Sequence, residues 1–208
     1  MKGRFITLEG VEGSGKTTNL GFLCETLRQK EVPFISTREP GGTDLAEAIR
    51  EAMLLDWKEN ISGLTEVLLV FAAREQHIVN VIKPNLDRGT WVVSDRFTDA
   101  TYAYQGEARD VDWSIIEKLE HWVQKDLQPD LTFFLDLPAE ESEARIADRK
   151  KDRMESENRA FFEKVRRGYL KRSQGNSRYR VLDASRSLAE VSADLKAQLS
   201  TFIDEVNI

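Results

Sequence analysis

Cysteine and long apolar runs are both scarce in this sequence. Cys24 is the only cysteine among 208 residues, so the chain cannot form an internal disulfide, and we expect a reducing, cytoplasmic location. The apolar stretch Phe5–Leu8 is too short to form the core of a secretion signal. No run of about 18 apolar residues occurs, so we expect no membrane span.

The chain also lacks an excess of positive charge. Its 30 basic and 36 acidic residues give a net charge of −6, which argues against broad electrostatic binding of nucleic acid. A single nucleotide is not excluded, because local cations in a cleft are enough to bind one. Hydrophobic residues make up 40% of the sequence, enough for a substantial core, and the length predicts one domain over residues 1–208.

A glycine-rich segment near the start carries the strongest signal. Residues Gly10–Thr17 read GVEGSGKT and fit the phosphate-loop pattern G-x-x-x-x-G-K-[ST] at every fixed position. A predicted strand, Arg4–Glu9, precedes the segment, and a predicted helix, Thr18–Gln29, follows it. Such a loop surrounds phosphate oxygens with backbone N–H groups at the positive end of a helix dipole. We therefore predict an ATP site formed by Gly10, Val11, Glu12, Gly13, Ser14, Gly15, Lys16, Thr17 and Thr18.

Strands and helices alternate along the chain. The predicted strands are Arg4–Glu9, Val32–Thr37, Trp91–Asp95, Leu131–Leu137 and Tyr179–Asp183. Several of them are continuous apolar runs, which suit a parallel sheet that is buried on both faces. Together with the phosphate loop, the alternation predicts an α/β fold of the P-loop NTPase type: a doubly wound, five-stranded parallel sheet flanked by helices. Ligands of such sheets bind beyond the carboxyl ends of the strands.

Charged residues follow the ends of the predicted strands. Asp95 ends a strand in the position of a Walker-B aspartate, where it can hold Mg²⁺ beside the Thr17 hydroxyl; the alternative is a helix N-cap. Lys16 can reach the β- and γ-phosphates of ATP, and Arg96 can clamp a phosphate with two hydrogen bonds. Arg38 begins an Arg-Glu-Pro-Gly-Gly-Thr turn, where a phosphate ligand and a solvated turn arginine are equally well supported.

Two further segments carry side chains suited to a nucleotide base. The predicted helix Leu64–Lys83 places Arg74 on or beside its apolar stripe, where it either extends to solvent or pairs with an anion in a cleft. Phe71 can offer its ring to a base, although such a residue is more often part of the core. Gln105 carries a donor and acceptors, and the ring of Tyr104 beside it can stack on a base or pack against a sugar.

Arginines are concentrated after the fourth predicted strand. Arg145, Arg149 and Arg153 recur at intervals of four, so they share one face if this segment is helical. The face is either simply solvated or part of a lid, at about residues 139–157, that closes over ATP and brings arginines to the transferred phosphoryl group. Its place after the carboxyl end of a strand favours the lid.

Taken together, five segments resemble the bacterial thymidylate kinase family. The segments are Glu9–Thr17, Arg38–Thr43, Phe71–Arg74, Asp95–Phe97 and Ala103–Gly106, and Asp152–Glu155 matches the lid of the family less strictly. The resemblance spans essentially the whole chain. It implies transfer of a phosphoryl group from ATP to dTMP, giving ADP and dTDP, with Mg²⁺ as cofactor.

The resemblance also implies roles for single residues. Glu12 would contact the deoxyribose 3′-hydroxyl, and Arg38 and Arg96 would hold the monophosphate. Phe71 would stack on thymine, and Arg74 and Gln105 would meet its edge. The implied substrate site comprises Glu12, Arg38, Phe71, Arg74, Arg96, Thr101, Tyr104 and Gln105, and the implied metal site comprises Thr17, Asp95 and Glu9.

The lid is the implied source of catalytic arginines. One subclass of the family has an arginine in the phosphate loop after its acidic residue, whereas this chain has Gly13 there. It therefore resembles the subclass with lid arginines, and the implied catalytic set is Lys16, Arg96, Arg149 and Arg153. The family is homodimeric, which implies an interface on the predicted helices Leu64–Lys83 and Trp113–Leu127.

Two other functions are compatible with a phosphate loop. The chain can be another small P-loop kinase that acts on a different nucleotide or metabolite. It can also be a GTPase-like switch, but the sequence contains neither D-x-x-G nor the N-K-x-D segment that reads guanine. A kinase is therefore the better supported prediction.

Overall fold

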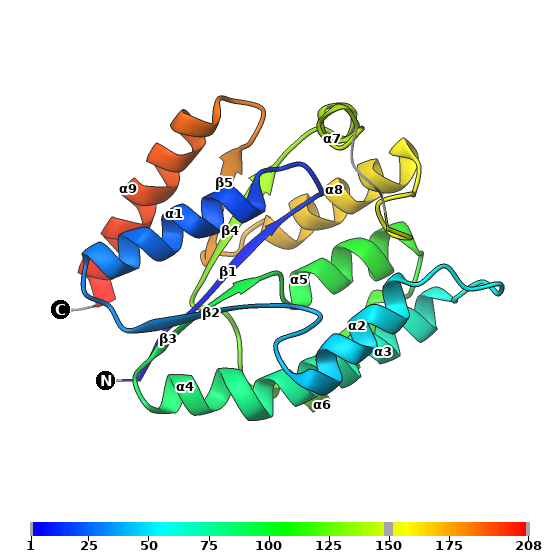
Figure 1. Ribbon diagram of the computed structural model, residues 1–208, viewed down its shortest axis with the longest axis horizontal. Coiled ribbons are helices and arrows are strands. Elements are labelled where there is room, and N and C mark those ends of the chain that lie inside the picture. The colour runs from blue at the N-terminus through cyan, green and yellow to red at the C-terminus, as the bar shows by residue number, and fades with distance from the viewer. Residues whose placement is uncertain (1, 148–151, 207–208) are drawn as a thin grey trace.

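Five parallel strands form one sheet in the computed structural model, which describes residues 2–147 and 152–206 (Figure 1). Each neighbouring pair of strands is parallel. The predicted α/β fold with a five-stranded parallel sheet is therefore confirmed. In the order β2-β3-β1-β4-β5 across the sheet, the strands are β1 (Phe5–Gly10), β2 (Phe34–Arg38), β3 (Trp91–Asp95), β4 (Leu131–Asp136) and β5 (Tyr179–Asp183).

The three central strands are buried on both faces. Every residue of β1 is buried, and in β3 and β4 only the last residue is partly exposed. Strands in this position have no solvated face that would favour alternating polar residues, so their sequences are mainly apolar, and the few polar side chains within them, such as Thr7 and Thr132, are buried. The last residue is the exception because it lies at the edge where side chains can reach a ligand.

Helices cover both faces of the sheet (Figure 1). On one face, α1 (Lys16–Gln29) and α9 (Leu188–Val206) lie side by side. On the other face lie α4 (Lys83–Asp87), α5 (Thr98–Thr101) and α8 (Arg159–Ser173). The other helical elements are α2 (Asp44–Leu54), α3 (Gly63–His77), α6 (Trp113–Gln124) and α7 (Ala139–Arg145), with π-helical segments η1 (Ile78–Ile82) and η2 (Tyr102–Ala108).

The single helix predicted over Leu64–Lys83 consists of three consecutive elements. α3, η1 and α4 follow one another without a break from residue 63 to residue 87. Pro84 lies in the first turn of α4, directly after the π-helical segment. Because proline has no backbone N–H to donate, it disrupts the α-helical pattern, and the wider π-helical turn accommodates it.

The helical face predicted for the lid arginines is wrong. α7 ends at Arg145, because the buried Ile146 leaves the helical conformation with φ −107° and ψ 7°. Arg153 lies in a turn, where Asp152 Oδ1 accepts hydrogen bonds from the backbone N–H groups of residues 154 (2.8 Å) and 155 (2.9 Å). Arg145 and Arg153 therefore do not share a helix, and Arg149 lies outside the described residues.

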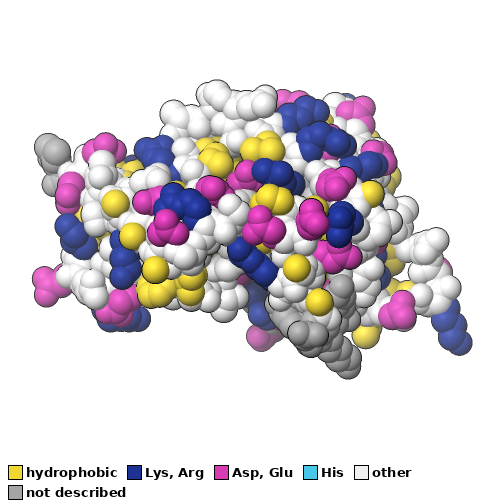
Figure 2. Space-filling model, turned by 90° about the horizontal axis from the view of Figure 1, so that it is seen from above, with side chains coloured by type: hydrophobic (Ala, Val, Ile, Leu, Met, Phe, Trp, Pro, Cys, Tyr) yellow, Lys and Arg dark blue, Asp and Glu magenta, His cyan; other side chains and the backbone are white. Residues whose placement is uncertain are grey.

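Charges of both signs are interspersed on the surface. Figure 2 shows basic and acidic side chains side by side over one face of the molecule. Exposed ion pairs such as Arg159–Glu143 (2.9 Å) contribute little to stability, because water and salt screen the two charges. Within residues 2–147 and 152–206, no helix has both the length and the apolar character needed to cross a membrane.

Asp99 on α5 provides a test of how buried charge stabilises this fold. Its carboxylate is 1% exposed and pairs with Arg172 of α8 (2.8 Å) and with Arg178 beside β5 (2.7 Å). Burial favours a raised pKa for Asp99, but the two arginines outweigh burial and lower the pKa. We expect Asp99→Asn to lower the free energy of unfolding by roughly 3–5 kcal/mol, because it leaves two arginines without a buried counter-charge.

Urea unfolding followed by circular dichroism measures this loss. Asp110→Asn is the matched control, because Asp110 pairs with Lys164 through a side chain that is 77% exposed. The control should change the free energy of unfolding by less than about 1 kcal/mol. Similar losses in the two variants would contradict the assignment of Asp99 as a stabilising buried charge.

Candidate active site

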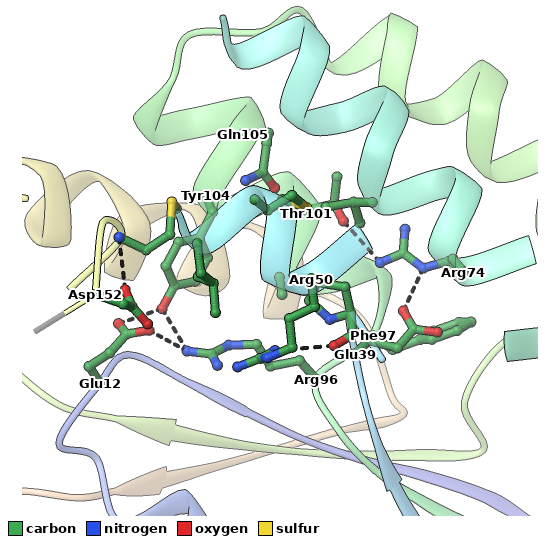
Figure 3. Close-up of a pocket in the computed structure, with 16 residues that line it drawn as sticks. Glu12, Glu39, Arg50, Arg74, Arg96, Phe97, Thr101, Tyr104, Gln105 and Asp152 are labelled. Carbon is green, nitrogen blue, oxygen red and sulfur yellow. Dashed lines mark hydrogen bonds and ion pairs between the residues drawn. The ribbon is translucent and has the colours of Figure 1, made fainter. Parts of the chain in front are cut away.

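Two cavities adjoin at the carboxyl edge of the sheet. The inner cavity has apolar walls that include Met53, Val70 and Phe97, and Figure 3 shows the polar side chains that project into it. The loop cavity is lined by the phosphate loop and the end of β3. The residues that line both are Glu12, Glu39, Arg50, Arg96 and Asp152.

The phosphate loop has the left-handed backbone that its glycines permit. Gly13 has φ 72° and Gly15 has φ 87°. Helix α7 lies against the loop, and Ser142 Oγ donates a 2.7 Å hydrogen bond to the carbonyl oxygen of Glu12. A Cβ atom at Gly13 would lie 3.1 Å from the carbonyl oxygen of Ser142, so a larger side chain there would strain the backbone and crowd α7.

The Lys16 side chain folds back onto this loop. Its Nζ donates to the carbonyl oxygens of Gly10 (2.9 Å) and Val11 (2.8 Å). Burial and then the nearby Arg96 lower the pKa of Lys16 from an ordinary 10.5 to about 8. The ammonium group is still mostly charged at neutral pH, and incoming phosphate oxygens can replace its two carbonyl partners.

Glu12, Arg96 and Tyr104 form a closed hydrogen-bonded group between the two cavities. Arg96 Nη2 lies 2.6 Å from Glu12 and 2.9 Å from the Tyr104 hydroxyl, which itself donates to Glu12 at 2.7 Å. Burial favours a raised pKa for Glu12, but Arg96 and Lys16 outweigh it and lower the pKa. Arg96 Nε is buried and has no hydrogen-bond partner among the described residues.

Arg74 is a buried cation with one unused nitrogen. Its side chain is 1% exposed, Nε donates to Glu39 (2.7 Å), and Nη2 donates to the Thr101 hydroxyl (3.0 Å). The second oxygen of Glu39 lies 2.9 Å from His77 Nδ1. In the described part of the chain, Arg74 Nη1 is buried without a partner, and Arg74 lines the inner cavity (Figure 3).

The acidic residues near the loop differ in their freedom to bind a cation. Asp95 lines the loop cavity, and its buried Oδ1 lacks a partner among the described residues. Glu9 lines neither cavity: its oxygens accept from Phe97 N (2.8 Å) and from the Tyr169 hydroxyl (2.9 Å). Burial and then Asp99 raise the pKa of Glu9 from 4.5 to about 8, so its neutral form prevails at pH 7.

Comparison with known proteins identifies the family. The thymidylate kinase family model matches residues 8–195 of this chain. The chain belongs to the thymidylate kinase family. A curated thymidylate kinase of Ectopseudomonas mendocina (strain ymp) is 53% identical over 206 residues, which cover 98% of each chain. That of Marinomonas sp. (strain MWYL1) is 47% identical over 202 residues, 96% of this chain and 95% of the relative.

Family membership confirms the resemblance seen in the motifs, and the structure brings many of the predicted residues together. The inner cavity is lined by Glu12, Arg74, Arg96, Thr101, Tyr104 and Gln105. The loop cavity is lined by Glu12, Gly13, Gly15, Lys16, Thr17, Thr18, Arg38, Asp95 and Arg96. Arg38 is 55% exposed and pairs with Glu47 (2.7 Å).

Phe71, Glu9 and Arg153 lie outside both cavities, and Gly10, Val11 and Ser14 of the phosphate loop line neither cavity. Phe71 is 2% exposed and packs in a core cluster, with its ring centre 4.7 Å from the Arg74 guanidinium. The neighbouring Val70 lines the inner cavity instead. Glu9 is enclosed behind β1 by its hydrogen bonds. Arg153 lines neither cavity and donates to the carbonyl oxygen of Met53 at 2.8 Å.

Arg50 is a candidate site residue that the motifs did not reveal. It projects from α2, lines both cavities, and donates to the carbonyl oxygen of Pro40 at 3.1 Å. The sequence did contain a signal for Arg50. The buried residues of α2 are Ala46, four residues before Arg50, and Met53, three residues after it. Arg50 thus lies on the apolar stripe of an amphipathic helix, as Arg74 does on α3.

Glu9 should make the stability of this thymidylate kinase family member depend on pH. Its pKa of about 8 in the folded chain exceeds its ordinary 4.5, so the folded state binds the proton more tightly. The contribution of Glu9 is therefore present below about pH 4.5 and is lost as pH rises to about 8. Glu9→Gln, which stays neutral, should gain stability relative to the wild type across this window. Urea unfolding at several pH values measures the difference, and parallel curves would contradict the raised pKa.

Proposed function

We propose that this chain transfers the γ-phosphoryl group of ATP to dTMP, giving ADP and dTDP. The observation that carries the proposal is the unpartnered Arg74 Nη1 beside the inner cavity, in a chain that belongs to the thymidylate kinase family. A buried donor without a partner costs about 1–3 kcal/mol. We therefore expect an acceptor atom of a bound ligand to take the hydrogen bond from Arg74 Nη1. A pyrimidine carbonyl oxygen meets that requirement.

The inner cavity supports recognition of a thymine edge. Gln105 Nε2 donates to Glu66 (3.0 Å), which leaves the side-chain carbonyl oxygen of Gln105 to accept from a ring N–H. Arg74 Nη1 donates to the adjacent ring carbonyl. Phe97 and Val70 supply apolar walls for the ring, in place of the stacking first expected from Phe71.

The boundary between the cavities supports binding of the sugar and its phosphate. The unpartnered Nε of Arg96 is a donor for the monophosphate, together with Arg38 and Arg50. Glu12 accepts from the deoxyribose 3′-hydroxyl, and its carboxylate is ionised because Arg96 and Lys16 lower its pKa. The acceptor phosphate is thereby directed toward the phosphate loop.

The loop cavity supports ATP with Mg²⁺. Asp95 Oδ1, buried without a described partner, and the exposed Thr17 hydroxyl would hold the cation. Mg²⁺ usually takes one or two protein oxygens and completes its shell with substrate phosphates and water, so this small donor set fits. When bound, the cation neutralises charge on the β- and γ-phosphates.

The chain's own residues position the reactants and neutralise charge. The acceptor is a phosphate oxygen that is already ionised near neutral pH, so no covalent intermediate is needed. Lys16 exchanges its two carbonyl partners for phosphate oxygens of ATP. Residues 139–157 act as the lid, and Arg149 keeps the catalytic role that the resemblance implies. The expected cytoplasmic location belongs to the same proposal.

A homodimer is part of this proposal. Exposed apolar side chains gather on two helices that are in contact, α3 with its continuation η1, and α6. Trp122 on α6 is 73% exposed, which is unusual for the largest apolar side chain. A second copy of the chain would cover Leu64, Leu68, Val79, Ile115 and Trp122.

A panel of acceptors tests the reaction. With ATP and Mg²⁺ in a coupled ADP assay, we expect kcat/KM for dTMP to exceed that for dCMP by at least about 100-fold, because dCMP lacks the 4-carbonyl and the N3–H that the cavity matches. Lys16→Ala should lose most of the turnover with its fold intact. Preference for dCMP or dUMP would overturn the choice of acceptor, and near-normal turnover in Lys16→Ala would refute the role of the loop.

The proposed dimer is tested by charge placed on its face. Trp122→Glu should shift the mass measured by light scattering from two chains toward one, because a carboxylate cannot be buried there without a partner. Trp57→Glu is the matched control, since Trp57 is 48% exposed but lies in the loop after α2. Dissociation of both variants, or of neither, would reject this interface.

A further inference from the structure

Glu66 on α3 is a fully buried carboxylate that joins three distant parts of the chain. Its exposed fraction is 0%, and no role in the proposed reaction involves it directly. One oxygen accepts from Gln105 Nε2 of η2 at 3.0 Å. The other lies 2.9 Å from Arg153 Nη1 and 3.4 Å from Arg109 Nη2. Glu66 therefore contacts a base-recognition residue on one side and two cations on the other.

Arg153 links this carboxylate to the wall of the inner cavity. Besides Glu66, it contacts the end of α2, where Nε donates to the carbonyl oxygen of Met53 at 2.8 Å. The residues on either side of it, Asp152 and Met154, both line the inner cavity. Glu12 lines the same cavity, and Figure 3 shows Asp152 and Glu12 on the same side of it. The side chain of Arg153 thus anchors the turn that forms this wall.

Arg109, the residue after η2, strengthens the same connection. It pairs with Glu157, at the end of the turn, at 2.7 Å, and its guanidinium lies 4.7 Å from the centre of the Phe161 ring. The turn is therefore held to Glu66 directly through Arg153 and indirectly through Arg109. Because a buried carboxylate without a counter-charge is costly, the turn cannot move away without leaving Glu66 poorly compensated.

We propose that Glu66 is a positioning residue that couples recognition of the acceptor base to the placement of the lid turn 152–157. Its Oε2 orients Gln105 toward the base, and its Oε1 anchors the turn through Arg153. The inference rests on the proposed function, because it assigns Gln105 to the base. It gives Arg153 the role of a lid anchor, in place of contact with the transferred phosphoryl group.

Substitutions of Glu66 and Arg153 separate the contact with Gln105 from the anchoring of the turn. Glu66→Gln keeps an oxygen for Gln105 but turns an amide toward the arginines, whereas Glu66→Ala loses both contacts. Arg153→Met removes the anchor and leaves Arg109 near Glu66. Glu25→Gln is the control: Glu25 is 46% exposed, pairs with Arg28 on α1, and touches neither cavity.

Steady-state kinetics and amide hydrogen exchange measure the effects of the two contacts of Glu66, with Gln105 and with Arg153. Glu66→Gln and Arg153→Met should raise KM for dTMP roughly tenfold with a smaller change in kcat, and should keep the preference for dTMP over dCMP. Glu66→Ala should also lower that preference roughly tenfold. The amides of Met154 and Glu155 should exchange faster in all three variants than in Glu25→Gln, because the anchored turn protects them.

The outcomes that overturn the proposal are distinct from failure of the proposed function. If the wild type phosphorylates dTMP but the variants match Glu25→Gln in KM, preference and amide exchange, Glu66 is merely structural and the inference is wrong. If Glu66→Gln does not fold, Arg153→Met alone decides between these outcomes. A wild type that does not phosphorylate dTMP rejects the proposed function and the role of Gln105, while the exchange rates still decide whether Arg153 anchors the turn.

Discussion

Compensation of buried charge is the constraint on which this structure depends. A parallel sheet that is buried on both faces leaves its carboxyl edge as the place where polar side chains can gather. A charge held there away from water must have a partner. Glu39 accepts from Arg74, Glu12 pairs with Arg96, and Glu66 lies between Arg153 and Arg109. These pairs connect segments that are far apart in the sequence, so the same interactions hold the loops together and shape the cavities.

The exceptions to this compensation indicate where ligands bind. Three buried atoms that line the cavities have no hydrogen-bond partner within the described residues: Arg74 Nη1, Arg96 Nε and Asp95 Oδ1. They occur in the order in which a pyrimidine base, a phosphate and a cation would follow one another from the inner cavity to the loop cavity. Glu9 shows the opposite case. Its two oxygens already have donors and it lines neither cavity, so the Glu9 side chain stabilises the fold.

Periodicity and loop chemistry predicted most of the fold. The runs in β3 and β5 were predicted with the observed bounds, since a turn residue (Gly89 or Asn176) comes shortly before each run and an aspartate ends it. The backbone of the lid was predicted poorly. The spacing of Arg145 and Arg153 is typical of a helix, but α7 ends at Arg145 and Arg153 lies in a turn. Burial of Ile146 ends α7, and the hydrogen bonds to Asp152 form a turn. Nothing in the local sequence separates an apolar residue that continues a helix from one that enters the core.

The sequence by itself determined the phosphate loop, the parallel sheet and the family, because each depends on residue types at fixed short spacings. Only the tertiary structure decided the direction of individual side chains. Phe71 and Val70 are adjacent in sequence, yet one enters the core and the other the inner cavity. Arg153 meets Glu66 across 87 residues, and Arg50 reaches a site that no motif assigns to it. The physical reason is that a charged side chain is placed by the partner that neutralises it, and that partner is defined only when distant segments pack together.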